Sequence, residues 1–345
     1  MNRFFPDFAA NDALRTKLGS EIVASTLSHA YILEGPRGSG KHTLALRIAA
    51  ALSCEKKRDP ASPIPCGTCP SCQKILSGNS PDIITIGREE KATLGVDAIR
   101  KIKTDIYVAP NDTAVKIYVI EDAHLMTNQA QNAFLLALEE PPEYVLFLLL
   151  CEDSKLLLET IRSRAQALHV EPVDTQTMDQ YLCKISSEAR TLKISNQAEY
   201  YEVLSIADGR IGAALDLLSP AKRKPIIDQR EKAKQFIRMC SDRANALVTL
   251  KHITSFGQKR DEVLEQLSYV QLCLRDLLLS KQSDSVPLCF FADREEAHSL
   301  AYCFTTPSLL SLCKAVEEAI SRLRSNANVK LTLTALAVHS GILQI

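Results

Sequence analysis

Short apolar runs alternate with amphipathic stretches through the first half of the chain. The runs have the length and continuous apolar character of buried strands and lie at residues 30–34, 83–86, 115–120 and 145–150. Between them, residues 41–54 place Leu44, Ile48 and Leu52 at helical spacing, and residues 128–140 also favour a helix. This alternation predicts an α/β domain with a parallel sheet that ends near residue 168.

The pattern changes after Asp174, where strand-like runs disappear and helical periodicity takes over. Turn signals near residues 207–209 and 219–220 divide this part of the chain. A length of 345 residues also exceeds the roughly 100 to 200 residues of one domain. We therefore predict three domains, which are an α/β nucleotide-binding-like domain at 1–168, a small helical domain at 169–218 and a helical C-terminal domain at 219–345.

Composition narrows the function classes. Hydrophobic residues make up 46% and charged residues 24% of the chain, so each domain can bury an ordinary core. Lys plus Arg and Asp plus Glu both total 41, and this balance argues against tight autonomous binding to nucleic acid. The N-terminus lacks a signal-peptide pattern, and the apolar run at 144–151 is far shorter than the ~20 residues that span a bilayer. We expect a cytoplasmic protein without membrane contact.

A glycine-rich segment follows the first apolar run and leads into a predicted helix. It has the Walker A frame of glycine, four residues, glycine and lysine: Gly35, Pro36, Arg37, Gly38, Ser39, Gly40 and Lys41. In this frame backbone N–H groups and the helix N-terminus bind phosphate oxygens, and Lys41 neutralises their charge. The next position should carry a hydroxyl for Mg²⁺, but it is His42, with Thr43 one residue late. The segment favours ATP or ADP binding over hydrolysis and makes Mg²⁺ binding doubtful; a ligand-free turn is the alternative.

An acidic pair follows the predicted strand at 115–120. Glu121 and Asp122 stand where a P-loop ATPase places the carboxylates that hold Mg²⁺ and polarise water, usually as Asp followed by Glu. The order here is reversed, so each carboxylate is displaced by about one bond length, and such displacements lower rates steeply. The same residues could instead only cap the next helix.

The eleven cysteines are expected to be reduced, and so to serve metal binding or core packing. Cys54, Cys66, Cys69 and Cys72 form a cluster with eleven, two and two residues between them. Their thiolates can close on a tetrahedral Zn²⁺ at about 2.3 Å without leaving a position for water. We predict a structural zinc insert at about 54–72, against a redox pair or chance clustering. The other cysteines lie on apolar patterns and are expected in the core: Cys151, Cys183, Cys240, Cys273, Cys289, Cys303 and Cys313.

Four segments in the first half resemble bacterial DNA polymerase III clamp-loader subunits of the delta-prime and gamma/tau type. They are HAYILEGPRGSGKHTLALRIAAAL, GVDAIRKI, IYVIEDAHLMTNQAQNAFLLALEEPPEYVLFLLL and ETIRSRAQ. LEEPP at 138–142 is particularly specific to this family, and residues 326–336 are similar to the end of its collar domain. The resemblance implies an AAA+ domain with a zinc insert, a helical lid and an all-helical collar.

The resemblance also assigns an arginine that acts on a neighbouring subunit. The family's Ser-Arg-Cys motif matches Ser163, Arg164 and Ala165, which implies that Arg164 is a trans arginine finger for the ATP of the adjacent subunit. A planar, permanently charged guanidinium suits a transferring phosphoryl group. Arg162 is a competing candidate, and a surface arginine without function is the alternative.

Two further departures separate the chain from the ATPase members of the family. The ATP-sensing arginine of the second domain aligns with Gly212, and the sensor-1 polar pair is replaced by Cys151 and Glu152. Weakened positions at the chain's own site beside a retained arginine are typical of the delta-prime type.

The resemblance therefore implies a subunit that assists ATP-dependent loading of a sliding clamp onto primed DNA. Its implied partners are gamma/tau and delta subunits, the sliding clamp and primer-template DNA within the complex. Two alternatives remain, namely a gamma/tau-type ATPase and, less favoured by the neutral charge, a zinc-containing DNA-binding module.

Overall fold

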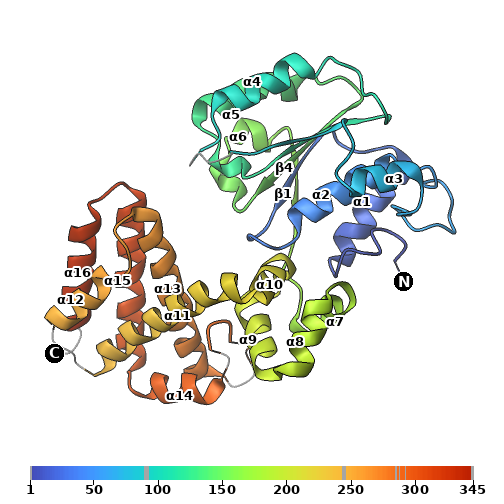
Figure 1. Ribbon diagram of the computed structural model, residues 1–345. Helices are drawn as coiled ribbons and strands as arrows, with labels where there is room; N and C mark the ends of the chain where they lie inside the picture. Colours follow the sequence, from blue (N-terminus) through green and yellow to red (C-terminus); the bar gives the residue numbers. More distant parts are fainter. Residues whose placement is uncertain are drawn as a thin grey trace. The chain divides into compact units, whose positions relative to one another are not determined.

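The computed structural model describes residues 2–88, 93–242, 246–283, 286, 288–291 and 293–342 (Figure 1). The chain forms two compact units. The first contains Met1–Ile185 and Gly209–Ala213, and the second contains Ser186–Asp208 and Ala214–Ile345. The predicted boundaries at 168/169 and 218/219 stay predictions.

The first unit is built on a parallel sheet. Within the described residues its strands are β1 Ala30–Glu34, β2 Ile83–Ile86, β3 Lys116–Ile120, β4 Val145–Cys151 and β5 Gln166–His169. They are arranged in the order β2-β3-β4-β1-β5, and every neighbouring pair is parallel. The register pairs Tyr31 with Leu148 and Gln166, so β1 lies between β4 and β5.

Helices cover both faces of this sheet. The α-helices of the unit are α1 Asp12–Ala24, α2 Lys41–Leu52, α3 Pro70–Leu76, α4 Val96–Asp105, α5 Asn128–Glu139, α6 Glu159–Arg162 and α7 Thr175–Ile185. The short 3-10 helices η1 and η2 are Ala123–Leu125 and Ser154–Leu156. Alternate residues of β1 point to opposite faces, so Tyr31 packs in the core with α1, α2 and α3, whereas Ile32 packs in the core with α4, α5 and α6.

The structure confirms the predicted α/β class. The strands predicted at 30–34 and 83–86 have those bounds, and those at 115–120 and 145–150 differ by one residue at one end. The sequence pattern missed β5, because this strand is short and Leu168 is its one fully buried position. A strand of that kind lacks the continuous apolar run of a central parallel strand.

The second unit is helical, as the loss of strand patterns predicts. Its helices are α8 Ser187–Ser195, α9 Gln197–Ala207, most of α10 Ile211–Leu218, α11 Pro220–Ser241, α12 Ala246–Thr254, α13 Arg260–Gln282, α14 Arg294–Tyr302, α15 Thr306–Arg324 and α16 Val329–Ile342. Residues of α11 to α16 share one apolar core around Phe236, Leu267 and Leu309. Among the described residues, no helix of either unit is long and apolar enough to cross a membrane.

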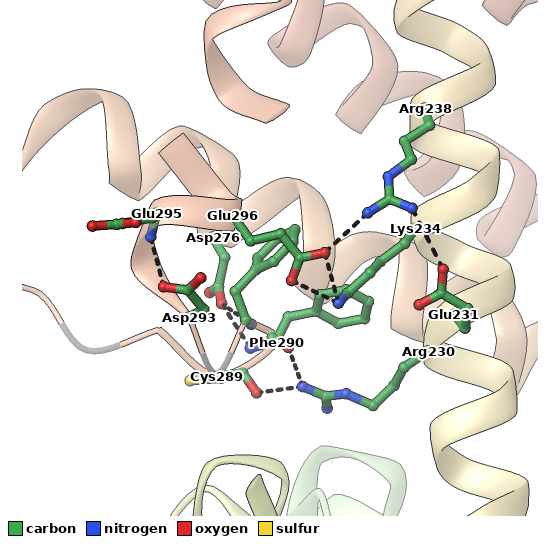
Figure 2. Close-up of polar contacts among 11 residues, drawn as sticks. Arg230, Glu231, Lys234, Arg238, Asp276, Cys289, Phe290, Asp293, Glu295 and Glu296 are labelled. Atoms are coloured by element: carbon green, nitrogen blue, oxygen red, sulfur yellow. Dashed lines mark hydrogen bonds and ion pairs between the residues drawn. The ribbon is translucent and has the colours of Figure 1, made fainter. Parts of the chain in front are cut away.

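Polar contacts along α11 fix the segment between α13 and α14 (Figure 2). Arg230 donates to the carbonyl oxygens of Cys289, at 2.9 Å, and Phe290. From α13, Asp276 accepts the backbone N–H of Phe290 at 2.6 Å. Lys234 donates to Glu296 of α14 at 2.8 Å. Because Arg230 and Asp276 are buried, these bonds offset part of the cost of removing the guanidinium and one carboxylate oxygen, Oδ2, from water.

The scattered cysteines follow the prediction with one clear exception. Cys151, Cys240, Cys273 and Cys289 are buried, and Cys183 and Cys313 are half-buried. Cys303 is exposed, so its assignment to the core was wrong. It caps the C-terminus of α14, where the helical apolar face ends.

Candidate functional site

The glycine-rich segment forms a phosphate-loop turn between β1 and α2. Gly38 and Gly40 have φ angles of 83° and 96°, which glycine adopts without strain. Gly40 caps the N-terminus of α2, and Lys41 begins the helix. The ammonium of Lys41 donates to the carbonyl oxygens of Gly35 at 2.6 Å and Pro36 at 2.9 Å. Burial lowers the pKa of Lys41, although the negative charge of Glu152 opposes this effect.

Most of the predicted nucleotide residues line one cavity of about 370 Å³. It is lined by Arg37, Gly38, Gly40, Lys41, His42, Thr43, Glu121, Asp122, Leu150, Glu152 and Gly212. The cavity lies at the carboxyl edge, meaning the edge where the carboxyl ends of the parallel strands β1, β3 and β4 lie. Gly35 does not line the cavity, but its carbonyl oxygen accepts a hydrogen bond from Lys41, which does. The sequence thus predicted correctly which segments meet.

His42, which stands where a hydroxyl ligand for Mg²⁺ is expected, contacts Glu121. His42 Nε2 lies 3.4 Å from Glu121 Oε1, with both side chains about half exposed, at 50% and 41%. Asp122 has a left-handed backbone, with φ at 48°, and its Oδ2 accepts from Nε of Arg88 at 2.9 Å. Both carboxylates therefore face groups of this chain that carry or can carry positive charge. A hydroxyl ligand for Mg²⁺ is missing at position 42.

Gly212 packs directly on the phosphate loop. Its N–H donates to the carbonyl oxygen of Gly38 at 2.9 Å, and an added Cβ would lie 3.1 Å from that oxygen. Position 212 therefore makes a close backbone contact with the loop. At the end of β4, burial raises the pKa of Cys151 to about 12, so its thiol stays neutral.

Arg164 lies between α6 and β5 and is held on one side. Its Nη1 donates to the carbonyl oxygen of Thr160 at 3.1 Å, and its Nη2 lies 3.2 Å from Oε1 of Glu139. α6 is held in turn by the Leu158 N–H, which donates to Gln131 of α5 at 2.7 Å. Arg162 is also exposed, but it has no ion pair within the described part of the chain. The structure therefore restrains Arg164 more than Arg162.

Arg164 and the phosphate-loop cavity lie at opposite edges of the sheet. β5 begins at Gln166, directly after Arg164, and Gln166 pairs with Tyr31 near the start of β1. Arg164 therefore lies at the amino edge, where the strands begin, whereas the cavity lies at the carboxyl edge. Arg164 therefore does not line the cavity at the chain's own loop.

The clustered cysteines come together as a possible metal centre. The sulfurs of Cys54, Cys66, Cys69 and Cys72 all lie within 4.8 Å of one another, which no other group of three or more potential ligands does in the described residues. Burial raises the pKa of the Cys54 and Cys72 thiols. Burial acts the same way on Cys66, but hydrogen bonds from Thr68 and Cys69 outweigh it and lower that pKa to about 6. Four sulfurs in this arrangement could hold a metal ion such as zinc.

Comparisons with known proteins find similarity to subunits of DNA polymerase III. Residues 10–174 match the family model described as "DNA polymerase III, delta subunit". The delta' subunit of DNA polymerase III from Yersinia pestis is 29% identical over 317 residues, which cover 89% of this chain and 87% of that protein. The chain is therefore similar to DNA polymerase III subunits over most of its length.

Other DNA polymerase III subunits match a smaller share of the chain. The tau subunit of Bacillus subtilis is 32% identical over 219 residues, which cover 63% of this chain and 37% of that protein. The chain spans about a third of the length of the tau proteins it matches. A gamma subunit-related protein from Thermotoga maritima aligns with a TM-score of 0.46 at 22% identity, over 95% of this chain and 98% of that chain.

The sequence analysis did not single out two residues that contact predicted site residues. Arg88 pairs with Asp122, and Glu139 pairs with Arg164. Arg88 comes two residues after β2, so its place near the carboxyl edge could have been a signal. Glu139 belongs to the LEEPP segment, which the motif marked without indicating a role.

Proposed function

We propose that the chain is a delta-prime-type clamp-loader subunit that does not hydrolyse ATP itself and supplies Arg164 to a neighbouring ATPase. In this role it assists ATP-dependent loading of a sliding clamp onto primed DNA. Its partners are gamma/tau and delta subunits, the clamp and primer-template DNA within the complex. The match of residues 10–174 to the family model and the alignment over most of the delta' relative support this assignment.

One observation carries the proposal. The contact between His42 and Glu121 occupies the metal position of the chain's own loop, while Arg164 is 38% exposed at the opposite edge of the sheet. Hydrolysis in P-loop ATPases depends on a correctly held Mg²⁺, and an arginine given in trans contributes about 10³ to 10⁵ in rate. The geometry therefore supports a subunit that has lost its own metal chemistry and kept the group that serves a neighbour.

We further propose two bound groups. The cavity of about 370 Å³ at Lys41 is large enough for part of a nucleotide, and the loop would bind ATP or ADP through backbone N–H groups and that lysine. The four clustered thiols would hold a structural Zn²⁺. The zinc would stabilise the insert after α2 and take no part in hydrolysis.

The test is single-turnover ATP hydrolysis in assembled complexes that carry one competent ATPase subunit beside this chain. Arg164→Ala should reduce the rate by about 10³-fold or more, without loss of assembly. Arg164→Lys should restore little, because an ammonium lacks the planar fork of a guanidinium. Arg162→Ala is the matched control. Normal hydrolysis by the Arg164→Ala complex would refute the arginine role, and ATP turnover by the isolated chain would favour a gamma/tau-type ATPase.

A further inference from the structure

The carboxylate of Glu139 holds the guanidinium of Arg164. Its Oε1 lies 3.2 Å from Nη2, and the two side chains are 49% and 38% exposed. Glu139 is the last residue of α5, and Arg164 follows α6. Both lie at the amino edge of the sheet, because β4 begins at Val145 and β5 at Gln166. The contact thus joins two segments that the fold brings together there.

Helix stability does not account for a glutamate at this position. The C-terminal end of a helix carries partial negative charge, so a carboxylate at Glu139 is locally unfavourable. An ion pair this exposed also contributes little to folding. The contact therefore orients the Arg164 side chain more than it stabilises the fold.

The geometry leaves the outer side of Arg164 available. A guanidinium has five N–H donors in a rigid fork. Within the described residues, one donor of Nη1 is used by the Thr160 carbonyl oxygen and one of Nη2 by Glu139. The other three donors have no partner among the described residues, so they could bind phosphate oxygens of another subunit.

We infer that Glu139 is the positioning residue of the trans arginine. The inference rests on the proposed function, because it assigns no role to Glu139 apart from Arg164. Without the carboxylate, Arg164 keeps its charge but loses one of the two bonds that restrain its side chain. The Arg164 side chain then samples more rotamers. It is therefore less often in the orientation that stabilises the transition state of hydrolysis on the partner subunit.

The experiment measures single-turnover hydrolysis by the adjacent ATPase subunit in assembled complexes with full-length chain. Glu139→Ala should slow hydrolysis by about two- to fivefold, because an exposed ion pair can shift the population of the oriented side chain by no more than that, while KM for ATP stays unchanged. The KM is expected to hold because the partner's own loop binds the nucleotide. Glu139→Asp should recover part of the rate. Glu140→Ala is the matched control, since it removes the same charge one residue later, where the structure gives no ion pair among the described residues.

The outcomes separate this inference from the proposed function. Normal hydrolysis by Arg164→Ala would refute both. A slow Arg164→Ala complex beside a normal Glu139→Ala complex would overturn the inference alone. Faster hydrolysis by Glu139→Ala would also overturn it, since the carboxylate would then restrain the arginine or oppose its charge. The double variant should be no slower than Arg164→Ala, and a further loss would show an independent role for Glu139.

Discussion

Replacing one sulfur of the cysteine cluster should release the metal and loosen one face of the first unit. A tetrahedral zinc with Zn–S bonds of about 2.3 Å needs sulfurs about 3.8 Å apart. Cys66 and Cys72 already lie 4.0 Å apart, and no pair of the cluster exceeds 4.8 Å, so each distance must shorten by about 1 Å or less. The four sulfurs therefore lie close to the spacing that a tetrahedral zinc requires.

The Cys69→Ser variant should therefore fall well below the one zinc per chain expected of the parent by elemental analysis. Hydrogen exchange should show lost protection in α3, because Cys69 and Cys72 pack in the core with α1, α2 and α3. Protection in α5 should remain, since that helix packs on the other face of the sheet. Cys303→Ser, which removes an exposed thiol, is the control. A parent without zinc, a variant that retains it, or equal loss of protection in α5 would refute this reasoning.

Three further results are expected. His42→Thr should leave ATP turnover by the isolated chain, measured as phosphate release, well below ~1 s⁻¹, which is the low end for kinases. The reason is that the reversed order of Glu121 and Asp122 remains. Gly212→Arg should lower the free energy of unfolding by about 1 to 3 kcal/mol in chemical denaturation, since its Cβ would lie 3.1 Å from the Gly38 oxygen. Asp82→Asn should lower that free energy by about 1 to 3 kcal/mol at neutral pH. Burial raises the pKa of Asp82, but three backbone N–H bonds outweigh it and lower that pKa, so the parent's advantage exists above about pH 4 and should disappear in more acidic solution.

The sequence predicted the parts of the site that depend on local pattern. The strand before Gly35, the turn and the helix from Lys41 each have a short-range signature, and the structure has all of them. The meeting of the loop with Glu121 also follows from sequence, because parallel strands bring their carboxyl ends to one edge. The clustering of the four thiols follows from spacing alone.

Contacts between side chains from distant segments could not be predicted. His42 reaches Glu121, and Arg88 reaches Asp122, only because of the strand order β2-β3-β4-β1-β5. The motif comparison marked Gly212 as a lost arginine, but the close packing of its backbone on Gly38 needs coordinates. Glu139 was visible in a motif, yet its partner lies in another segment.

The separation of the two edges explains how one edge can lose its chemistry while the other keeps it. The residues that face the chain's own loop, such as His42 and Gly212, lie at the carboxyl edge, and Arg164 with Glu139 lies at the amino edge. Sites that share no partners usually respond to substitution independently. Changes at the metal position would then leave the orientation of Arg164 intact. The two edges are nevertheless joined by one stretch of chain. β4 ends at Cys151 at the carboxyl edge, and the chain then passes through α6 to Arg164 at the amino edge. A subunit built in this way can hold its arginine in place for a neighbour whether or not its own loop is filled.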